Sequence, residues 1–228
     1  MLHYFLAFAM KKYTLTAFLL CFFAFAAIAQ EAAVQAKGYY NSDFIIDNIP
    51  RYVNFYIPAG FGKKDEYPLV FILHGEGETG KTMMKRYSDD IERLADSSTA
   101  IVIYPDAVKG HWNTKMDSRA ATDTINDAGF IQIMLDYFVQ RYSASPGRIY
   151  ILGFNSGGDM AWRLGCNLGK KIAAIAPFIT SVTNAQNSCE QPVPFFNAEK
   201  YTTQPVKKFS YGALSEAWRF LLQNQLSK

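Results

Sequence analysis

Four short runs of consecutive apolar residues stand out in the middle of this chain. They lie at residues 68–73, 100–104, 148–154 and 172–178. Each run has the length of a strand and is apolar almost throughout, which is typical of a strand that is covered on both faces. An alternating segment at 51–58 predicts an earlier strand, and shorter runs at 192–196 and 213–222 predict a last strand and a last helix.

Between these runs, apolar residues recur at helical spacing. The first set is Met83, Tyr87, Ile91 and Leu94, and the second is Ile131, Met134, Leu135, Phe138 and Tyr142. Thr124 and Asp127 predict a capping box at the start of the second helix. Because buried strands alternate with helices, the sequence predicts an α/β fold, with a mainly parallel sheet covered by helices on both faces. Sites in such sheets lie at the carboxyl ends of the strands.

The first 29 residues have the features of a secretory signal peptide. Lys11 and Lys12 precede a long apolar stretch that ends in a small-x-small pattern at 27–29. Cleavage there predicts a secreted or periplasmic protein, with a leader at 30–50 and a single domain at 51–228. A membrane anchor is the alternative interpretation, but the apolar stretch is short for a membrane span.

Removal of the signal peptide leaves a nearly neutral chain. It takes away two of the 23 basic residues and none of the 20 acidic ones, so the mature net charge is about +1. This balance gives no electrostatic reason to expect nucleic acid or an anionic surface as a partner. The sequence also gives no reason to expect a metal ion or a cofactor. Two cysteines remain, Cys166 and Cys189, which suggest a disulfide in an exported protein; two buried free thiols are the alternative.

The loop after the first apolar run has two chemical interpretations. Gly75 to Thr82 satisfy the phosphate-loop pattern, which would make the protein a nucleoside triphosphatase. Against this, Glu76 and Glu78 would place two carboxylates beside the bound anion. Alternatively, His74 and Gly75 begin an oxyanion loop, in which a backbone N–H beyond the glycine, at Glu76, faces developing negative charge. A plain glycine-rich turn is the third interpretation.

The third apolar run leads into a second unusual turn. A strand, a tight glycine-flanked turn and a helix are typical of a nucleophile elbow, which needs small residues two positions before and after its tip. Gly153 and Gly157 meet this need if the tip is Asn155, whereas a tip at Ser156 would put Phe154 in the crowded position. Asn155 is therefore the predicted tip. Ser156 then starts the helix, where its N–H would serve the oxyanion hole, and it is a weak candidate for the nucleophile.

The order of these motifs resembles that of secreted polyhydroxybutyrate depolymerases, feruloyl esterases and acetylxylan esterase-like proteins. The residues that carry the resemblance are 67–75, 101–106, 112–113, 127–130, 148–158, 160–166, 173–177, 189 and 192–194. The resemblance implies a single-domain α/β-hydrolase fold, here with a short C-terminal part. It also implies a Cys166–Cys189 bridge and cleavage of esters in hydroxyalkanoate polymers or acylated plant polysaccharides.

The chain departs from the family pattern at its catalytic positions. Those families carry serine where this chain has Asn155, and after the last predicted strand they carry a catalytic acid where this chain offers only Glu199. They supply the catalytic histidine later still, whereas no histidine follows His111 in these 228 residues. A serine hydroxyl without a base is a poor nucleophile. Catalytic competence is therefore doubtful, and the alternative is a non-catalytic relative that binds a polymer or an oligosaccharide.

Three further residues near the strand ends are candidates for lesser roles. His111 is a weak candidate for an improvised base. His74 is expected to be structural and to hold its loop in place. Trp112 is a candidate for lining the substrate cleft, where it would stack on a sugar or an aromatic acyl group, although packing in the protein interior explains it equally well.

Overall fold

A computed structural model describes residues 36–114, 125–178, 189, 193–198, 201 and 208–227. These residues belong to one compact unit that begins at Ala36. The predicted signal peptide, together with the part of the predicted leader before residue 36, lies outside the described residues. Within the described part, no helix has both the length and the apolar composition needed to cross a membrane.

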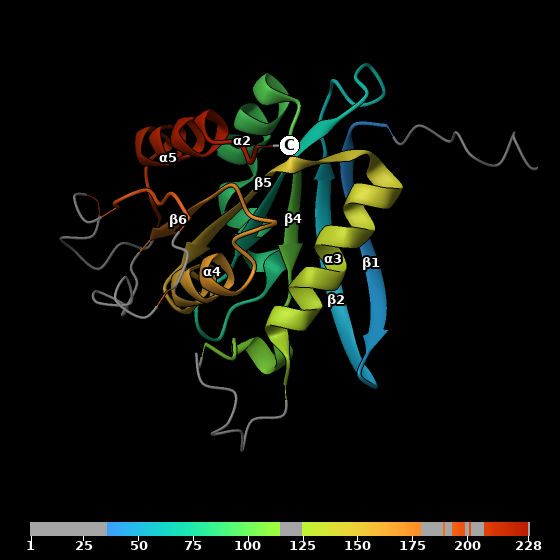
Figure 1. The fold of residues 1–228 in the computed structure, drawn as a ribbon, viewed down its shortest axis with the longest axis vertical. Helices are drawn as coiled ribbons and strands as arrows, with labels where there is room; N and C mark the ends of the chain where they lie inside the picture. Colours follow the sequence, from blue (N-terminus) through green and yellow to red (C-terminus); the bar gives the residue numbers. More distant parts are fainter. Residues whose placement is uncertain are drawn as a thin grey trace, which may run out of the picture. The chain divides into compact units, whose positions relative to one another are not determined.

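The centre of this unit is a six-stranded sheet (Figure 1). Its strands are β1 (Gly38–Ile46), β2 (Ile49–Ile57), β3 (Tyr67–Leu73), β4 (Ile101–Pro105), β5 (Ala144–Phe154) and β6 (Ala174–Phe178). Their spatial order is β1-β2-β4-β3-β5-β6. Strands β3 to β6 run parallel, whereas β1 and β2 form an antiparallel hairpin and β2 pairs antiparallel with β4. The prediction of a mainly parallel sheet is therefore confirmed.

Helices cover both faces of the sheet. They are α2 (Gly80–Ser98), α3 (Asp127–Tyr142), α4 (Ser156–Asn167) and α5 (Tyr211–Gln223), with a short 3-10 helix η1 (Val108–Gly110) after β4. Residues of α3 and α4 pack on one face, for example Phe138 and Leu164, and residues of α2 and α5 pack on the other, for example Tyr87 and Trp218. In Figure 1, α3 and α4 lie on the near side of the sheet. The fully buried central strands explain the continuous apolar runs in the sequence.

The expected leader is wrong from residue 38 onward, because the chain there forms β1 and the start of β2. Asp47 and Asn48 join the two strands in a two-residue turn, with φ of 52° and 60°, the backbone that such hairpin turns require. Alternate residues of β1 pack against the core, among them Tyr40 and Phe44. Exposed and partly buried residues alternate along this strand, and Asn41, Ser42 and Asp43 interrupt its apolar residues, so it lacks the continuous apolar run that marks the central strands.

Two other expectations differ in detail from the structure. The strand expected at 192–196 is reduced to a single parallel bridge between Phe195 and Ile175. The capping box expected from Thr124 and Asp127 is replaced by Asn126, whose side chain accepts the Gly129 N–H at 2.9 Å. Thr124 itself lies outside the described residues.

Candidate functional site

The turn between β5 and α4 has a strained backbone at its tip. Asn155 has φ of 52° and ψ of −123°, a combination that residues with a side chain adopt rarely and at a cost in free energy. Its N–H donates to the Phe178 carbonyl at 2.8 Å, and its own carbonyl accepts the Gly158 N–H at 2.7 Å. These hydrogen bonds hold the tip in place. Asn155 itself is exposed to solvent.

The glycines on either side of the tip fit the turn because they have no side chain. A Cβ atom on Gly153 would lie 2.0 Å from the Gly157 carbonyl oxygen, and a Cβ atom on Gly157 would lie 2.5 Å from the carbonyl oxygens of Leu73 and His74. Such contacts are impossible for real atoms, so both positions require glycine. The elbow therefore packs directly on the end of β3, with Asn155 at its tip.

Ser156 is the first residue of α4 and does not lie at the tip. Its Oγ is buried and has no hydrogen-bond partner among the described residues. Neither His74 nor His111 is therefore hydrogen-bonded to this hydroxyl. A serine hydroxyl needs a base within hydrogen-bond distance to act as a nucleophile, and none of the described residues supplies one here.

His74 is committed to holding the loop after β3. The side chain is fully buried, its Nδ1 lies 2.8 Å from the Gly75 carbonyl oxygen, and its Nε2 accepts the Ala107 N–H at 3.0 Å. This pairing fixes the neutral tautomer with the proton on Nδ1. Burial lowers the pKa of the His74 imidazole below its usual value, which favours the same neutral form. Both nitrogens are occupied, so His74 cannot act as a general base at the elbow.

Trp112 packs inside the protein and does not line an open cleft. It is 6% exposed, its Nε1 donates to the His74 carbonyl at 2.9 Å, and its ring lies 4.9 Å from the His74 ring. The interpretation of Trp112 as a stacking platform for a substrate is therefore wrong. Its function is to support the loop that carries His74.

His111 lies on the surface of the same region, paired with Glu76. The Nδ1 of His111 is in close contact with Oε1 of Glu76, and both side chains are more than half exposed, at 62% and 54%. The pair does not reach the Ser156 hydroxyl, which has no partner in the described residues. The structure therefore places His111 beside the loop after β3 and does not join it to Ser156 as a catalytic base.

The backbone N–H of Gly75, which lies close to the tip of the elbow, is hydrogen-bonded to a carboxylate. The Gly75 N–H donates to Oε2 of Glu78 at 3.1 Å, and a Cβ atom on Gly75 would lie 3.2 Å from that oxygen and 3.4 Å from Cβ of Asn155. Arg86 holds the other Glu78 oxygen in an ion pair. The Gly75 amide is thus unavailable to a developing oxyanion, which would also be repelled by the Glu78 charge.

The phosphate-loop interpretation is contradicted by the partners of the same loop. The Gly77 N–H donates to the Gly110 carbonyl at 3.0 Å, and the Gly80 N–H donates to Oδ1 of Asp106 at 2.5 Å. The Thr82 hydroxyl, which would face magnesium in a phosphate loop, donates to the Thr79 carbonyl as part of the cap of α2. A phosphate loop works by directing free N–H groups at an anion. Here carboxylates and carbonyls already accept them.

A buried ion pair behind the loop was not foreseen from the sequence. Arg51 on β2 donates to Oδ1 of Asp127 at 2.6 Å, and the two side chains are 3% and 0% exposed. The Arg51 guanidinium also lies 3.8 Å from the centre of the Phe130 ring. The two residues are 76 positions apart, so no local pattern could have joined them.

The same carboxylate fixes the segment that follows Trp112. Oδ2 of Asp127 accepts the Asn113 N–H at 2.7 Å, and the Asn113 carbonyl accepts a hydrogen bond from Arg163 of α4. Burial lowers the pKa of the Arg163 guanidinium, and the charge of Asp127 opposes that shift. The network thus connects β2, the Trp112 segment and the helix that begins at the elbow.

The other observations define the surroundings of the site. Cys166 at the end of α4 forms a disulfide with Cys189, with a Cα–Cα distance of 5.3 Å. A pocket of about 300 Å³ lies between the hairpin and the loops after β3 and β4, with Tyr52, Glu78 and Asp106 in its wall. Within the described residues, no three histidine, cysteine or acidic side chains are grouped so that they could hold a metal ion.

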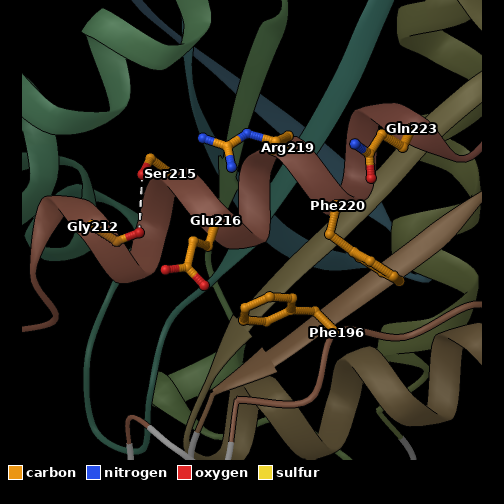
Figure 2. Close-up of a pocket in the computed structure, with 7 residues that line it drawn as sticks. All are labelled: Phe196, Gly212, Ser215, Glu216, Arg219, Phe220 and Gln223. Carbon is orange, nitrogen blue, oxygen red and sulfur yellow. Dashed lines mark hydrogen bonds between the residues drawn. The ribbon is translucent and has the colours of Figure 1, made fainter.

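A second pocket, of about 490 Å³, lies along α5 and contains none of the elbow or loop residues (Figure 2). Its apolar part is formed by Phe196 and Phe220, whose rings are 5.8 Å apart. Figure 2 shows both rings and the Glu216 carboxylate on the same side of the helix. The two pockets are thus separate features, and the smaller one shares Glu78 with the region of the elbow.

Comparison with known proteins finds several that are similar to this chain. No protein-family model matches the chain. Feruloyl esterase B of Piromyces equi is 27% identical over 120 residues, which are 53% of this chain and 22% of that protein. Feruloyl esterase D of Neurospora crassa is 23% identical over 167 residues, with 68% of this chain and 54% of that protein covered. The chain thus spans well under two thirds of the length of these curated relatives.

Solved structures of esterases are similar as well. A thermostable esterase gives a TM-score of 0.56 at 15% identity, with 82% of this chain and 63% of that chain covered. The acetyl xylan esterase from Aspergillus awamori gives 0.52 at 18% identity, with 61% and 50% covered. The fold is that of the α/β-hydrolases. The resemblance to feruloyl and acetyl xylan esterases is confirmed, and the α/β-hydrolase scaffold carries an elbow whose tip is asparagine.

Proposed function

We propose that this protein uses its α/β-hydrolase scaffold to bind an ester-bearing ligand and that it does not hydrolyse the ester efficiently. The observation that carries the proposal is Asn155 at the tip of the elbow. The tip keeps the strained backbone that presents a nucleophile in hydrolases of this fold, with φ of 52° and ψ of −123°. A carboxamide nitrogen is not a nucleophile for acyl transfer, so the position that should attack the ester cannot do so.

An asparagine at this position is nevertheless suited to binding. Its side chain offers an NH₂ donor and a carbonyl acceptor, which can pair with the carbonyl and the alkoxy oxygen or hydroxyls of an ester ligand. Strained backbone persists only where the surrounding structure holds it, and here the hydrogen bonds of Asn155 with Phe178 and Gly158 hold it. The proposal therefore assigns the preserved elbow to ligand recognition.

The electrostatics of the loop after β3 supports the same conclusion. Glu78 accepts the Gly75 N–H and so places a carboxylate, ion-paired with Arg86, next to the Glu76 N–H that is the expected oxyanion donor. Loss of one donor from an oxyanion hole costs on the order of 10²–10³ in kcat. Asn155 and Glu78 thus impair two separate parts of the reaction.

Hydrolysis by Ser156 is the second candidate function. Its Oγ is buried without a partner among the described residues and lies next to the tip, so it is a free hydroxyl close to the expected position. The hydroxyl still needs a base, and no described residue lies within hydrogen-bond distance of it. This reading predicts slow hydrolysis that depends on Ser156.

The ligand and the location of the protein follow from its relatives and its first residues. Feruloyl and acetyl xylan esterases among the relatives support an acylated polysaccharide as the ligand, with a hydroxyalkanoate polymer as the alternative. The predicted signal peptide over the first 29 residues supports secretion or export to the periplasm, where such polymers are met.

Two measurements on the same variants test the proposal. Calorimetric titration with feruloylated xylo-oligosaccharides should show binding that Asn155→Ala weakens. Hydrolysis of 4-nitrophenyl acetate should equal the rate without protein, and Ser156→Ala should leave it unchanged. Asn155→Ser should restore little activity, because triad members act as a unit and the described residues place no base at the elbow. Turnover by the wild-type protein that Ser156→Ala abolishes would reverse the proposal in favour of the second candidate.

A further inference from the structure

Strand β1 is an open edge of the sheet. It is the terminal strand, and β2 is its only neighbouring strand in the described part of the chain. All nine of its residues pair one to one with β2, so no bulge interrupts it. The side of β1 that faces away from β2 therefore presents a regular row of backbone N–H and C=O groups, which is a template for pairing with another strand.

The edge lacks the devices that usually prevent such pairing. Folded proteins protect their edge strands with lysine, proline, bulges or short lengths. Residues 38–46 contain neither lysine nor proline, and Asp43 is their only charged residue. Two large apolar side chains are exposed on this strand, Ile45 at 79% and Tyr39 at 37%.

We propose that β1 pairs antiparallel with β1 of a second copy of this chain, with the two-fold axis at Ser42. In this register all nine residues are paired, and every residue opposes one on the same face of the sheet. Tyr39 lies opposite Ile45 of the second copy, and Tyr40 lies opposite Phe44. Aromatic residues opposite β-branched or aromatic residues are favourable cross-strand pairs.

The single charge in the strand disfavours the register centred on Asp43. With the axis at Ser42, Asp43 lies opposite Asn41 of the second copy, and no like charges meet. With the axis at Asp43, the two Asp43 carboxylates would be directly opposite, which is unfavourable. A shift by a single position would turn the apolar core-facing residues of one copy to the other face of the sheet.

A cysteine on the proposed axis tests the register directly. Residues directly opposite in antiparallel strands have Cα atoms about 4.5–5.5 Å apart, within the range that a disulfide spans. Ser42→Cys should therefore yield a disulfide-linked dimer on a non-reducing gel after mild oxidation. Asn41→Cys is the matched control, because its two copies would lie about 8 Å apart, beyond disulfide reach. Crosslinking of the control to the same extent as Ser42→Cys, or no crosslinking of Ser42→Cys, overturns the proposal.

Sedimentation velocity over a range of concentrations tests the pairing without a crosslink. The wild-type chain should form a reversible dimer, and Ile45→Lys should remain monomeric. Asn41→Lys, which places an ammonium opposite Asp43, should lower the dissociation constant about fivefold, and Asn41→Asp should raise it by a similar factor. A wild-type chain that is monomeric at all concentrations, or a dimer that is indifferent to Ile45→Lys and to both changes at Asn41, overturns the proposal.

Discussion

Removal of the Asp127 carboxylate should cost this protein a large part of its stability. In the Asp127→Ala variant, Arg51 keeps its charge in a site where its side chain is 3% exposed, without the carboxylate 2.6 Å away. Breaking a buried pair by deleting one partner costs about 3–5 kcal/mol, because the remaining charge is left uncompensated. The Asn113 N–H also loses its acceptor at 2.7 Å. The expected loss is about a fifth or more of the stability of a typical domain.

Urea unfolding, followed by tryptophan fluorescence and circular dichroism, measures this loss. The matched control is Asp136→Ala, which removes the carboxylate from an exposed ion pair with Lys171, where the side chains are 50% and 40% exposed. That pair should contribute no more than about 1 kcal/mol. A second variant, Arg51→Met with Asp127→Leu, replaces the buried pair with apolar side chains and should recover most of the lost stability.

The reasoning about this ion pair fails under two results. Asp127→Ala could unfold within about 1 kcal/mol of the wild-type protein, which would show that Arg51 does not suffer from losing its partner. Alternatively, the Asp136→Ala control could cost as much as Asp127→Ala, which would show that burial is not the source of the effect.

Three further predictions concern the elbow, the buried histidine and the disulfide. Gly157→Ala should destabilise the fold by about 2 kcal/mol or more in urea unfolding, since the added Cβ would lie 2.5 Å from the carbonyl oxygens of Leu73 and His74. Burial lowers the pKa of His74, so the unfolded state binds more protons than the folded state below pH about 6.5. The unfolding free energy should therefore fall as the pH falls below that value, by up to about 1.4 kcal/mol per pH unit. His74→Gln should remove this pH dependence. Reduction of the Cys166–Cys189 bond, which closes a loop with a sequence separation of 23, should cost about 3 kcal/mol, measured by unfolding with and without reductant; no change would contradict its structural role.

The sheet and its covering helices could be predicted because their signals are local. The apolar runs at 68–73 and 172–178 correspond to β3 and β6, whose residues are buried throughout. Met83 and Tyr87, which recur at helical spacing, lie on the buried face of α2. Strand β1 escaped prediction because its burial alternates with exposure and polar residues such as Asn41 occupy its outer face.

The site could be predicted only as far as its backbone. The spacing of Gly153 and Gly157 fixes which residue stands between them, and the structure shows the steric contacts that make both glycines necessary. The partners of the side chains could not be predicted, because they come from distant segments. Trp112 reaches the His74 carbonyl across 38 positions, and Arg51 reaches Asp127 across 76. Such contacts depend on how the strands are ordered in space.

The most direct test of the claim that this elbow has no activated nucleophile is a search for a reactive serine. A fluorophosphonate reacts with such a serine when Oγ attacks phosphorus and fluoride leaves, so that the mass of the chain rises by one bound probe. With Asn155 at the tip and no described base at the Ser156 hydroxyl, the intact mass of the wild-type protein should stay unchanged after incubation with the probe. A stoichiometric adduct on Ser156, absent from Ser156→Ala, would contradict the account.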